Sequence, residues 1–306
     1  MSRYMFRLAH ISDVHLGPLP RLSLTELASK RITGYWNWHR NRKKHMFSNA
    51  LEMLCADILE KAPDHLAITG DLVNLGSGIE IRAVAEWLRV VGDPVSTTVI
   101  PGNHDAYVPG ARDKAVEAWY NYMRGDNDPL TFEQDDKLFP TIRRRGPVAI
   151  IGCSTALATP PFAASGFFSS RQARETAELL KKAGEEGLFR VVLIHHPPIP
   201  GATTQYKRMI GIRRFAAAIA VGGAELVLHG HTHLNSLYWL ESKGRKVPVV
   251  GIASASQGPG SPKPRAAYNL FSIGGKPGAW HVDWERHSLD KLAGHIEVDH
   301  RHRLYG

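Results

Sequence analysis

The sequence predicts an α/β domain with mixed β-sheets, and three observations carry this prediction. Short apolar runs bounded by Gly, Pro or Asp recur along the chain, as buried strands do. Segments with helical periodicity separate these runs, which is typical of parallel βα units. After His233 the pattern changes to closely spaced strands joined by Gly, Pro and Lys turns, which indicates added antiparallel pairs.

The elements follow in order from these patterns. Strands that alternate with helices are expected, from their short apolar runs, at Phe6–Ser12, His65–Thr69, Thr97–Ile100, Val148–Gly152, Val191–Ile194 and Glu225–Leu228. Helices are expected, from apolar residues that recur on one face, at His45–Lys61, Ile79–Val91, Arg112–Met123, Arg171–Gly187 and Lys207–Val221. The later strands, bounded by turn residues, are expected at Ser236–Glu241, Val247–Ala253, Ala267–Ile273 and Ala279–Trp284.

The length of 306 residues allows about two domains at roughly 150 residues per domain. No linker rich in Ser, Pro or charge divides the chain, and the loop signal at Gly258–Pro264 is short. We therefore expect residues 1–306 to form a single domain, with an insertion at about 16–44 and a C-terminal β-meander from about 236.

Composition excludes several classes of protein. Apolar residues make up 43% and charged residues 22%, which is too apolar for a disordered chain. The two cysteines, Cys55 and Cys153, cannot form a disulfide framework or a four-thiolate zinc site, and we expect both to pack in the core. Met1–His10 lacks the apolar stretch of a signal peptide, and no run of about 18 apolar residues predicts a transmembrane helix. A cytoplasmic location is expected.

Side chains with metal-binding atoms follow five of the predicted strands, where loops at the carboxyl ends of strands form α/β active sites. The segments are Ser12-Asp13-Val14-His15, Thr69-Gly70-Asp71, Pro101-Gly102-Asn103-His104-Asp105, His195-His196-Pro197-Pro198 and His229-Gly230-His231-Thr232-His233. Seven of the 16 His lie in them. Carboxylates, an amide and imidazoles without thiolate suit Mn²⁺, Fe²⁺, Co²⁺ or Zn²⁺ and not an all-oxygen Ca²⁺ site. The donors exceed the roughly four to six that one ion takes, which predicts two divalent metal ions.

The Asp-x-His, Gly-Asp, Gly-Asn-His-Asp, His and Gly-His-x-His series, running in this order from Asp13 to His233, resembles the calcineurin-like metallophosphoesterase superfamily. The resemblance implies two mixed β-sheets packed face to face as a sandwich, with helices outside. It also implies a dinuclear metal-dependent phosphoesterase acting on a small phosphate ester. In such an enzyme a hydroxide held by the metals attacks phosphorus in line.

The resemblance also implies a role for each matching residue. The first metal would be held by Asp13, His15, Asp71 and His233, and the second by Asp71, Asn103, His195 and His231, with Asp71 bridging. His195 is preferred to His196 because the family ligand is the His at the strand end, two residues before a Pro. His104 would stabilise charge or protonate the leaving oxygen, with Asp105 orienting its imidazole by a hydrogen bond.

The segment from about 16 to 44 is the largest departure from the ordinary pattern, because 55 residues separate His15 from Asp71. Ser23-Leu24-Thr25-Glu26 matches a capping box and predicts a short helix. Trp36 and Trp38 precede a basic cluster at Arg40–Lys44. Either the aromatic residues pack on the domain beside a solvated basic face, or the segment contacts a membrane interface, a nucleotide or an anionic substrate.

The remaining basic residues give no concentrated surface. The net charge of +9 is spread over Arg40–Lys44, Arg143–Arg145, Arg213–Arg214 and a polar C-terminal tail from His295 to Arg303. We expect the two internal arginine groups to be solvated. A nucleic-acid binder should show a basic stripe or a known motif, so no dedicated nucleic-acid module is predicted. Nothing in the sequence decides the oligomeric state.

Within the superfamily, the segment His195–Pro198 is similar to that of bacterial class III cyclic-nucleotide and glycerophosphodiester phosphodiesterases. Phosphodiesterase activity is therefore the first prediction. One alternative is a peripheral membrane hydrolase of a lipid-linked nucleotide pyrophosphate, of the UDP-diacylglucosamine type, which would use the insertion to meet lipid. Another is a phosphomonoesterase, because the same ligand set serves both. The complete ligand set and His104 argue against a non-catalytic phosphate-binding module.

Overall fold

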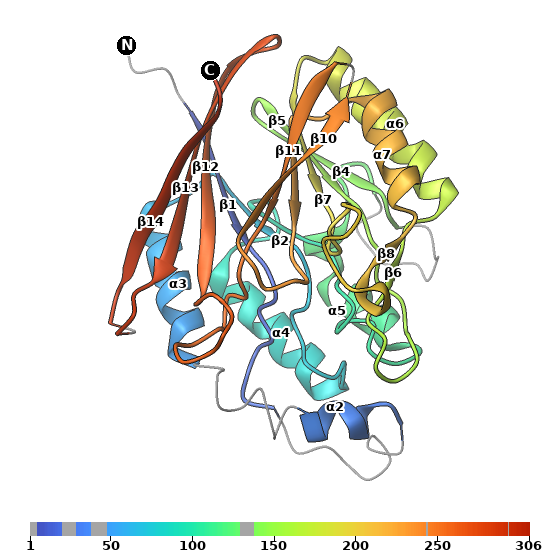
Figure 1. Ribbon diagram of the computed structural model, residues 1–306, viewed down its shortest axis with the longest axis vertical. Coiled ribbons are helices and arrows are strands. Elements are labelled where there is room, and N and C mark those ends of the chain that lie inside the picture. Colours follow the sequence, from blue (N-terminus) through green and yellow to red (C-terminus); the bar gives the residue numbers. More distant parts are fainter. Residues whose placement is uncertain (1–4, 20–28, 38–47, 129–137, 243, 293) are drawn as a thin grey trace.

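Two mixed six-stranded sheets form the centre of the molecule, and helices flank them (Figure 1). In this computed structural model the described residues are 5–19, 29–37, 48–128, 138–242, 244–292 and 294–306. The arrangement is the α/β sandwich that the sequence predicts. Apolar side chains from both sheets, among them Leu8, Val191 and Phe271, are fully buried in one core cluster. Each side chain of this size stabilises the fold by about 1.5–3 kcal/mol when buried.

The first sheet has the strand order β14-β13-β12-β1-β2-β3. Its strands are β1 (Phe6–Ile11), β2 (His65–Ile68), β3 (Thr97–Val99), β12 (Ala267–Lys276), β13 (Ala279–Leu289) and β14 (Ile296–Tyr305). β1 and β2 are parallel, with Ile11 opposite Ile68. This register brings the loops after both strands together, and the backbone N–H of Asp13 donates to the carbonyl of Gly70 at 2.9 Å.

The second sheet has the strand order β10-β11-β9-β7-β5-β4. Its strands are β4 (Thr141–Arg145), β5 (Val148–Gly152), β7 (Phe189–Leu193), β9 (Leu226–His229), β10 (Ser236–Ser242) and β11 (Arg245–Gly251). β7 and β9 are parallel, with Leu193 opposite Leu228. The N–H of Gly230 donates to the carbonyl of His195 at 3.1 Å, so the segments after these two strands also lie side by side.

Helices flank the sheets, except for α2 (Arg31–Asn37), which lies beyond the sheet ends at the bottom of the view (Figure 1). The others are α3 (Ser48–Lys61), α4 (Gly78–Val91), α5 (Ala111–Met123), α6 (Ser170–Glu185) and α7 (Ile212–Gly222). α6 and α7 pack together on the second sheet, and α3 contacts β13 and β14 of the first. Two short parallel strands, β6 (Gly166–Phe167) and β8 (Met209–Ile210), form a separate small sheet, and a 3₁₀ turn (Gln205–Lys207) precedes β8.

One predicted helix begins later than expected, and the predicted C-terminal strands belong to two sheets. The helix predicted from Lys207 begins only at Ile212, because Gly211 has a left-handed φ of 104° and the preceding Met209 pairs with β6. The closely spaced strands after residue 236 are divided between the sheets. β10 and β11 form a hairpin in the second sheet, whereas β12, β13 and β14 form an antiparallel meander in the first.

Two expectations about charged segments are wrong. The polar C-terminal tail is the edge strand β14, in which the ring of His300 lies 4.6 Å from that of Trp284. Arg143 is 3% exposed, not solvated. Its Nε donates to the carbonyl of Arg124 at 2.7 Å and its Nη2 to that of Asn121 at 2.7 Å. Burial lowers the pKa of Arg143 to about 10. Carbonyl acceptors from neighbouring turns therefore replace the water that the sequence led us to expect.

Part of the insertion is visible. Arg31, at the start of α2, donates from Nε to the carbonyl of Leu75 at 3.1 Å and from Nη2 to that of Gly76 at 2.7 Å. These bonds hold α2 against the loop that follows β2. The predicted helix start at Ser23, the side chain of Trp36, and the segment containing Trp38 and Arg40–Lys44 lie outside the described residues. Among the helices that the structure describes, none has the length and apolar character to cross a membrane.

Candidate metal centre

The seven predicted ligands lie together where the loops at the ends of the two sheets meet. Histidine and aspartate side chains there form three groups whose ligand atoms lie within 4.8 Å of one another. The groups are Asp13, His15 and His233; His15, Asp71 and His104; and Asp71, His195 and His231. They share members, so they make one continuous cluster with room for more than one ion.

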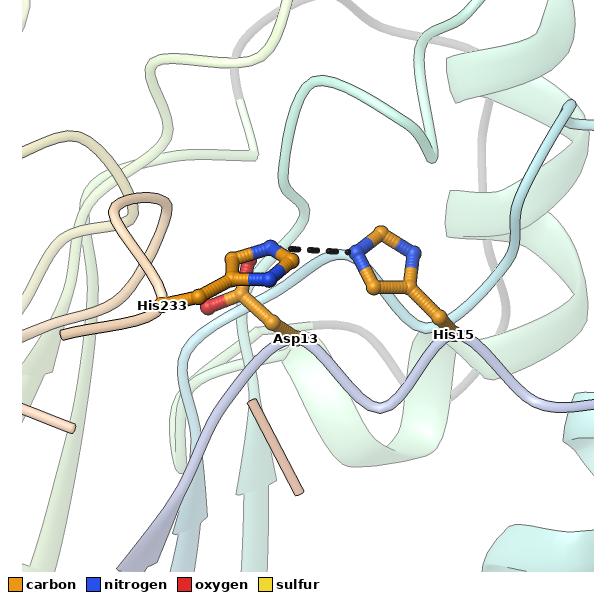
Figure 2. Close-up of side chains that lie close together, drawn as sticks. All are labelled: Asp13, His15 and His233. Carbon is orange, nitrogen blue, oxygen red and sulfur yellow. Dashed lines mark hydrogen bonds and ion pairs between the residues drawn. The ribbon is translucent and has the colours of Figure 1, made fainter. Parts of the chain in front are cut away.

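The first group surrounds Asp13, which follows β1 (Figure 2). Nε2 of His233 lies 3.1 Å from Oδ1 of Asp13 and 3.4 Å from Nε2 of His15. Asp13 is fully buried, and its Oδ1 faces the ring nitrogen of His233 without a well-formed hydrogen bond in the described part of the chain. A buried carboxylate oxygen in this setting is unfavourable unless the imidazole is protonated or a metal ion lies between the two. These residues therefore fit a divalent metal ion.

The group of Asp71, His195 and His231 lies beside the first group. Oδ2 of Asp71 is 3.4 Å from Nε2 of His195 and 4.0 Å from Nε2 of His15, so one carboxylate faces predicted ligands of both ions. Oδ1 of Asn103 is 3.1 Å from Nε2 of His195 and 2.8 Å from Nδ1 of His231. This is the placement that a bridging Asp71 and an Asn103 ligand require.

Backbone carbonyls orient three of the imidazoles. Nδ1 of His15 bonds the carbonyl of Val73 at 3.0 Å, and Nδ1 of His195 bonds that of Thr69 at 2.7 Å. Nε2 of His231 bonds the carbonyl of Lys207 at 2.9 Å. Because a carbonyl only accepts, each of these nitrogens carries a hydrogen, and the opposite nitrogen is the one that faces the centre. The ring orientations suited to metal binding are therefore set before any ion binds.

Several candidate ligands share the same strained backbone conformation. Five candidate ligands have left-handed φ values between 43° and 69°, namely Asp13, His15, Asp71, His231 and His233. Such residues cost roughly 1–3 kcal/mol each and persist where the surroundings determine them. Here the N–H of His15 donates to the carbonyl of Asp71, and the N–H of His231 donates to Oδ2 of Asp13, both at 2.9 Å.

Two glycines allow the loops to approach this closely. A Cβ at Gly102 would lie 2.2 Å from Oδ1 of Asp71, and one at Gly230 would lie 1.8 Å from Oγ of Ser12. Backbone therefore fills positions next to the carboxylates where no side chain fits.

The charge states favour cation binding. Burial would raise the pKa of Asp71, but the positive charges of His195 and His104 hold it well below its usual range. Burial would likewise lower the pKa of His195, but the Asp71 carboxylate raises it to about 9. Burial also lowers the pKa of His231 well below its usual value. The Asp71 carboxylate is therefore ionised, and a metal ion would take the place of the proton on His195.

His104 and Asp105 lie beside the cluster, but they do not interact as predicted. The N–H of His104 donates to Oδ1 of Asp71 at 2.7 Å, and its Nδ1 bonds the carbonyl of Asn74 at 2.5 Å. Asn74, and not Asp105, therefore orients the imidazole. Asp105 accepts hydrogen bonds instead from four backbone N–H groups, at 2.8–3.1 Å, those of Asp71, Leu72, Val73 and Gly102. Its role is to fasten two ligand loops together.

Some supporting residues were not anticipated. Glu80, at the start of α4, accepts from the N–H groups of Asn74 at 2.8 Å and Ser77 at 3.0 Å, which fixes the carbonyl that holds His104. The Ser77-x-x-Glu80 capping box in the sequence was a signal for this contact. His196 lies outside the three ligand groups, with its nitrogens bonded to Oγ1 of Thr155 at 2.7 Å and the carbonyl of Ala164 at 3.1 Å.

The cluster opens onto a pocket of about 570 Å³. We call this the ester pocket. Its floor contains Asp71, Asn103, His104, His231 and His233, and its walls contain Lys30, Ile32, Thr33, Tyr107, Phe162, Ala163, Ala164, Lys207 and Lys263. Three lysines and several apolar groups thus face a centre of imidazoles and carboxylates, an arrangement suited to an anion with an organic substituent.

Comparisons with known proteins identify the family of this chain. The profile that describes the calcineurin-like phosphoesterases matches residues 6–235. The chain belongs to the calcineurin-like phosphoesterase family. Family members are dimetal-dependent hydrolases of phosphate esters, and the His/Asp groups above are the candidate metal ligands of this member. A search of the curated proteins gave no significant match.

Solved structures share the fold of this calcineurin-like phosphoesterase at low sequence identity. A dimetal phosphatase from Danio rerio has a TM-score of 0.59 and 11% identity, over 96% of this chain and 98% of that chain. Purple acid phosphatase from yellow lupin, Lupinus luteus, has a TM-score of 0.59 and 10% identity, over 99% of this chain but only 54% of that chain. At these identities the likeness describes the fold and not the substrate.

Proposed function

We propose that the protein is a phosphodiesterase that hydrolyses a small phosphate diester with two divalent metal ions, drawn from Mn²⁺, Fe²⁺, Zn²⁺ and Co²⁺. The observation that carries the proposal is the ester pocket, whose 570 Å³ exceeds what a phosphoryl group needs. Its walls come from separate segments, with Ile32 on α2, Phe162 in the loop before β6 and Lys263 in the loop before β12. Organic groups on both sides of a phosphate would therefore find contacts.

Different residues would bind the metal ions, donate a proton and attract the substrate. Asp13, His15, Asp71 and His233 would hold one ion, and Asp71, Asn103, His195 and His231 the other. When bound, the two ions supply Lewis acidity and allow water to act as a nucleophile at neutral pH. His104 would give its proton from Nε2 to the leaving oxygen, since the carbonyl of Asn74 holds Nδ1. Lysines at the pocket walls would attract the anionic ester.

The experiment is a substrate comparison in Mn²⁺, Co²⁺ or Zn²⁺. Bis(p-nitrophenyl) phosphate should be hydrolysed with a higher kcat/KM than p-nitrophenyl phosphate, and chelator-treated protein should hydrolyse neither. Turnover of the monoester alone would favour a phosphomonoesterase, and no turnover with any ion would refute the enzyme proposal. A panel of cyclic nucleotides, glycerophosphodiesters and UDP-diacylglucosamine would then identify the diester.

A second candidate is hydrolysis of a lipid-linked nucleotide pyrophosphate at a membrane surface. Phe162 is 89% exposed and Ile32 is 58% exposed, and both line the ester pocket. Apolar side chains at the entrance of an anion-binding pocket would suit an acylated substrate. Liposome flotation separates the candidates, because binding that is lost in Phe162→Asp favours the lipid substrate. The buried free thiols of Cys55 and Cys153 support a reducing, cytoplasmic location for either activity.

A further inference from the structure

A second cavity, of about 360 Å³, lies next to the ester pocket. We call it the basic cavity. Lys263 lines both spaces, and its Nζ donates to the carbonyl of Thr232 at 3.2 Å, between the ligands His231 and His233. Asn235, on the wall of the basic cavity, is only two residues from His233, a stretch of chain that spans at most about 7 Å. The two spaces are therefore close enough for one small molecule to reach both.

The charges on the walls of the basic cavity favour an anion. Lys263, Arg265 and Lys291 line it. A carboxylate, that of Asp299, also lies on the wall, but its Oδ1 accepts from Nε of Arg286 at 2.7 Å, which neutralises it. The net charge of the side chains that line the basic cavity is therefore positive.

A buried hydroxyl on the wall lacks a partner. Ser288, near the end of β13, is 3% exposed, and its Oγ makes no hydrogen bond within the described residues. Buried polar groups in folded proteins are nearly always paired. Because Ser288 also lines the basic cavity, a change of its side-chain rotamer would offer this hydroxyl to an oxyanion there. The unpaired hydroxyl is thus a reason for ligand binding that is separate from the charge of the walls.

The walls are held in place by backbone contacts. The N–H of Ala266 donates to the carbonyl of Gln257 at 2.7 Å and closes the base of the loop that carries Lys263. Nε of Arg265 donates to the carbonyl of Leu289 at 2.7 Å. That bond fixes the guanidinium plane while the two terminal nitrogens remain for a planar pair of hydrogen bonds to an oxyanion.

We propose that the basic cavity binds a second phosphate group of the same substrate whose reacting phosphate lies at the metal centre. The substrate is therefore a phosphate diester that carries a further phosphate about one sugar unit away. The link to a reacting ester rests on the proposed function, whereas anion binding in the cavity does not.

Anion binding is tested by calorimetric titration of the metal-free protein, kept in chelator, with inorganic phosphate. Lys291→Glu and Ser288→Ala should each weaken binding by about tenfold, as expected for loss of one hydrogen bond to a charged group. Lys276→Glu, the same charge change at the end of β12, should leave the affinity unchanged. Ser288→Ala should fold with an unchanged or higher Tm, since it removes an unpaired hydroxyl. Wild-type affinity in both cavity variants would overturn the proposal.

The link to the substrate is tested with two esters that share a reacting phosphate and a leaving group. These are the 4-nitrophenyl ester of thymidine 5′-phosphate and the same ester with an added 3′-phosphate. The added phosphate should lower KM by about tenfold with little change in kcat. Lys291→Glu should remove this difference, and Lys276→Glu should retain it. Equal KM values for the two esters in the wild type refute the substrate assignment. If neither ester is hydrolysed, the proposed function fails while the calorimetry still decides on the basic cavity.

Discussion

The floor and the walls of the ester pocket are built in different ways. In the metal centre, whose exposed part is the floor, five ligands have left-handed backbones, and main-chain carbonyls fix the rings of three histidines. On the walls, Phe162 and Ile32 are largely exposed. A rigid floor keeps charges in place for a reaction, whereas exposed walls make contacts that binding alone can use. Changes to the floor should therefore lower kcat, and changes to the walls should raise KM.

The largest effect is expected at Asp71, because its carboxylate faces ligands of both proposed ions. Asp71→Ala should abolish binding of at least one ion and lower turnover by about 10³-fold or more. Asp71→Asn keeps the shape and tolerates the left-handed φ of 56°, so it separates loss of charge from backbone strain. Metal content and hydrolysis of bis(p-nitrophenyl) phosphate measure both effects.

The control for this prediction is Asp113→Ala, which removes an exposed carboxylate near the start of α5. It should retain metal content and rate. Two bound ions and wild-type turnover in Asp71→Asn would show that Asp71 does not bridge.

His104 tests whether a floor residue acts by holding a metal or by moving a proton. Its ligand atom lies within 4.8 Å of those of His15 and Asp71, so geometry alone permits either role. As a general acid, His104→Asn should lower kcat by about 10²–10⁴-fold and leave the metal content at wild type. The loss should be larger for a phenyl than for a p-nitrophenyl leaving group, because the poorer leaving oxygen depends more on protonation. Loss of a metal ion would instead make His104 a ligand.

The main effect of substituting Asp105 should be a loss of folding stability. Its carboxylate accepts four N–H groups, and Asp105→Asn would replace one accepting oxygen by a donor, so that two of them lose their acceptor. Each buried unpaired group costs about 1–3 kcal/mol, so the free energy of unfolding should fall by roughly 2–6 kcal/mol. Urea denaturation of the metal-free protein measures this. The matched control Asp93→Asn alters an exposed carboxylate that accepts from the N–H groups of Val95 and Ser96, and it should cost under about 1 kcal/mol. Equal losses in both variants would deny Asp105 a special structural role.

The difference between floor and walls also explains what the sequence could predict. The metal centre that forms the floor is encoded locally, because Asp13, Asp71 and His231 each follow a buried strand in a short motif. Parallel pairing then brings such loops to one edge without further information. The strands at the centre of each sheet are recognisable for a similar reason, since they are apolar on both faces.

The walls and the sheet edges are not encoded in this way. Lys30, Phe162 and Lys263 come from loops far apart in the sequence, and only the complete fold places them around one space. β14 alternates charged residues with partly buried ones, so its composition resembles a solvated tail until β13 pairs with it. Arg143 is buried among carbonyls of distant turns, which no local pattern indicates.

The smallest predicted effect concerns the wall. Phe162 is 89% exposed, so Phe162→Ala removes little packing and should change Tm only slightly. If an organic group of the substrate covers this ring, the variant should raise KM by roughly three- to tenfold, since partial burial of an aromatic side chain contributes about 1 kcal/mol. The kcat should stay within about twofold, because the floor is unchanged. Val90→Ala, a change to another largely exposed apolar residue, on α4, should alter neither constant. A fall in kcat in Phe162→Ala would mean that the wall positions the reacting phosphate, and the separation between floor and wall would no longer hold.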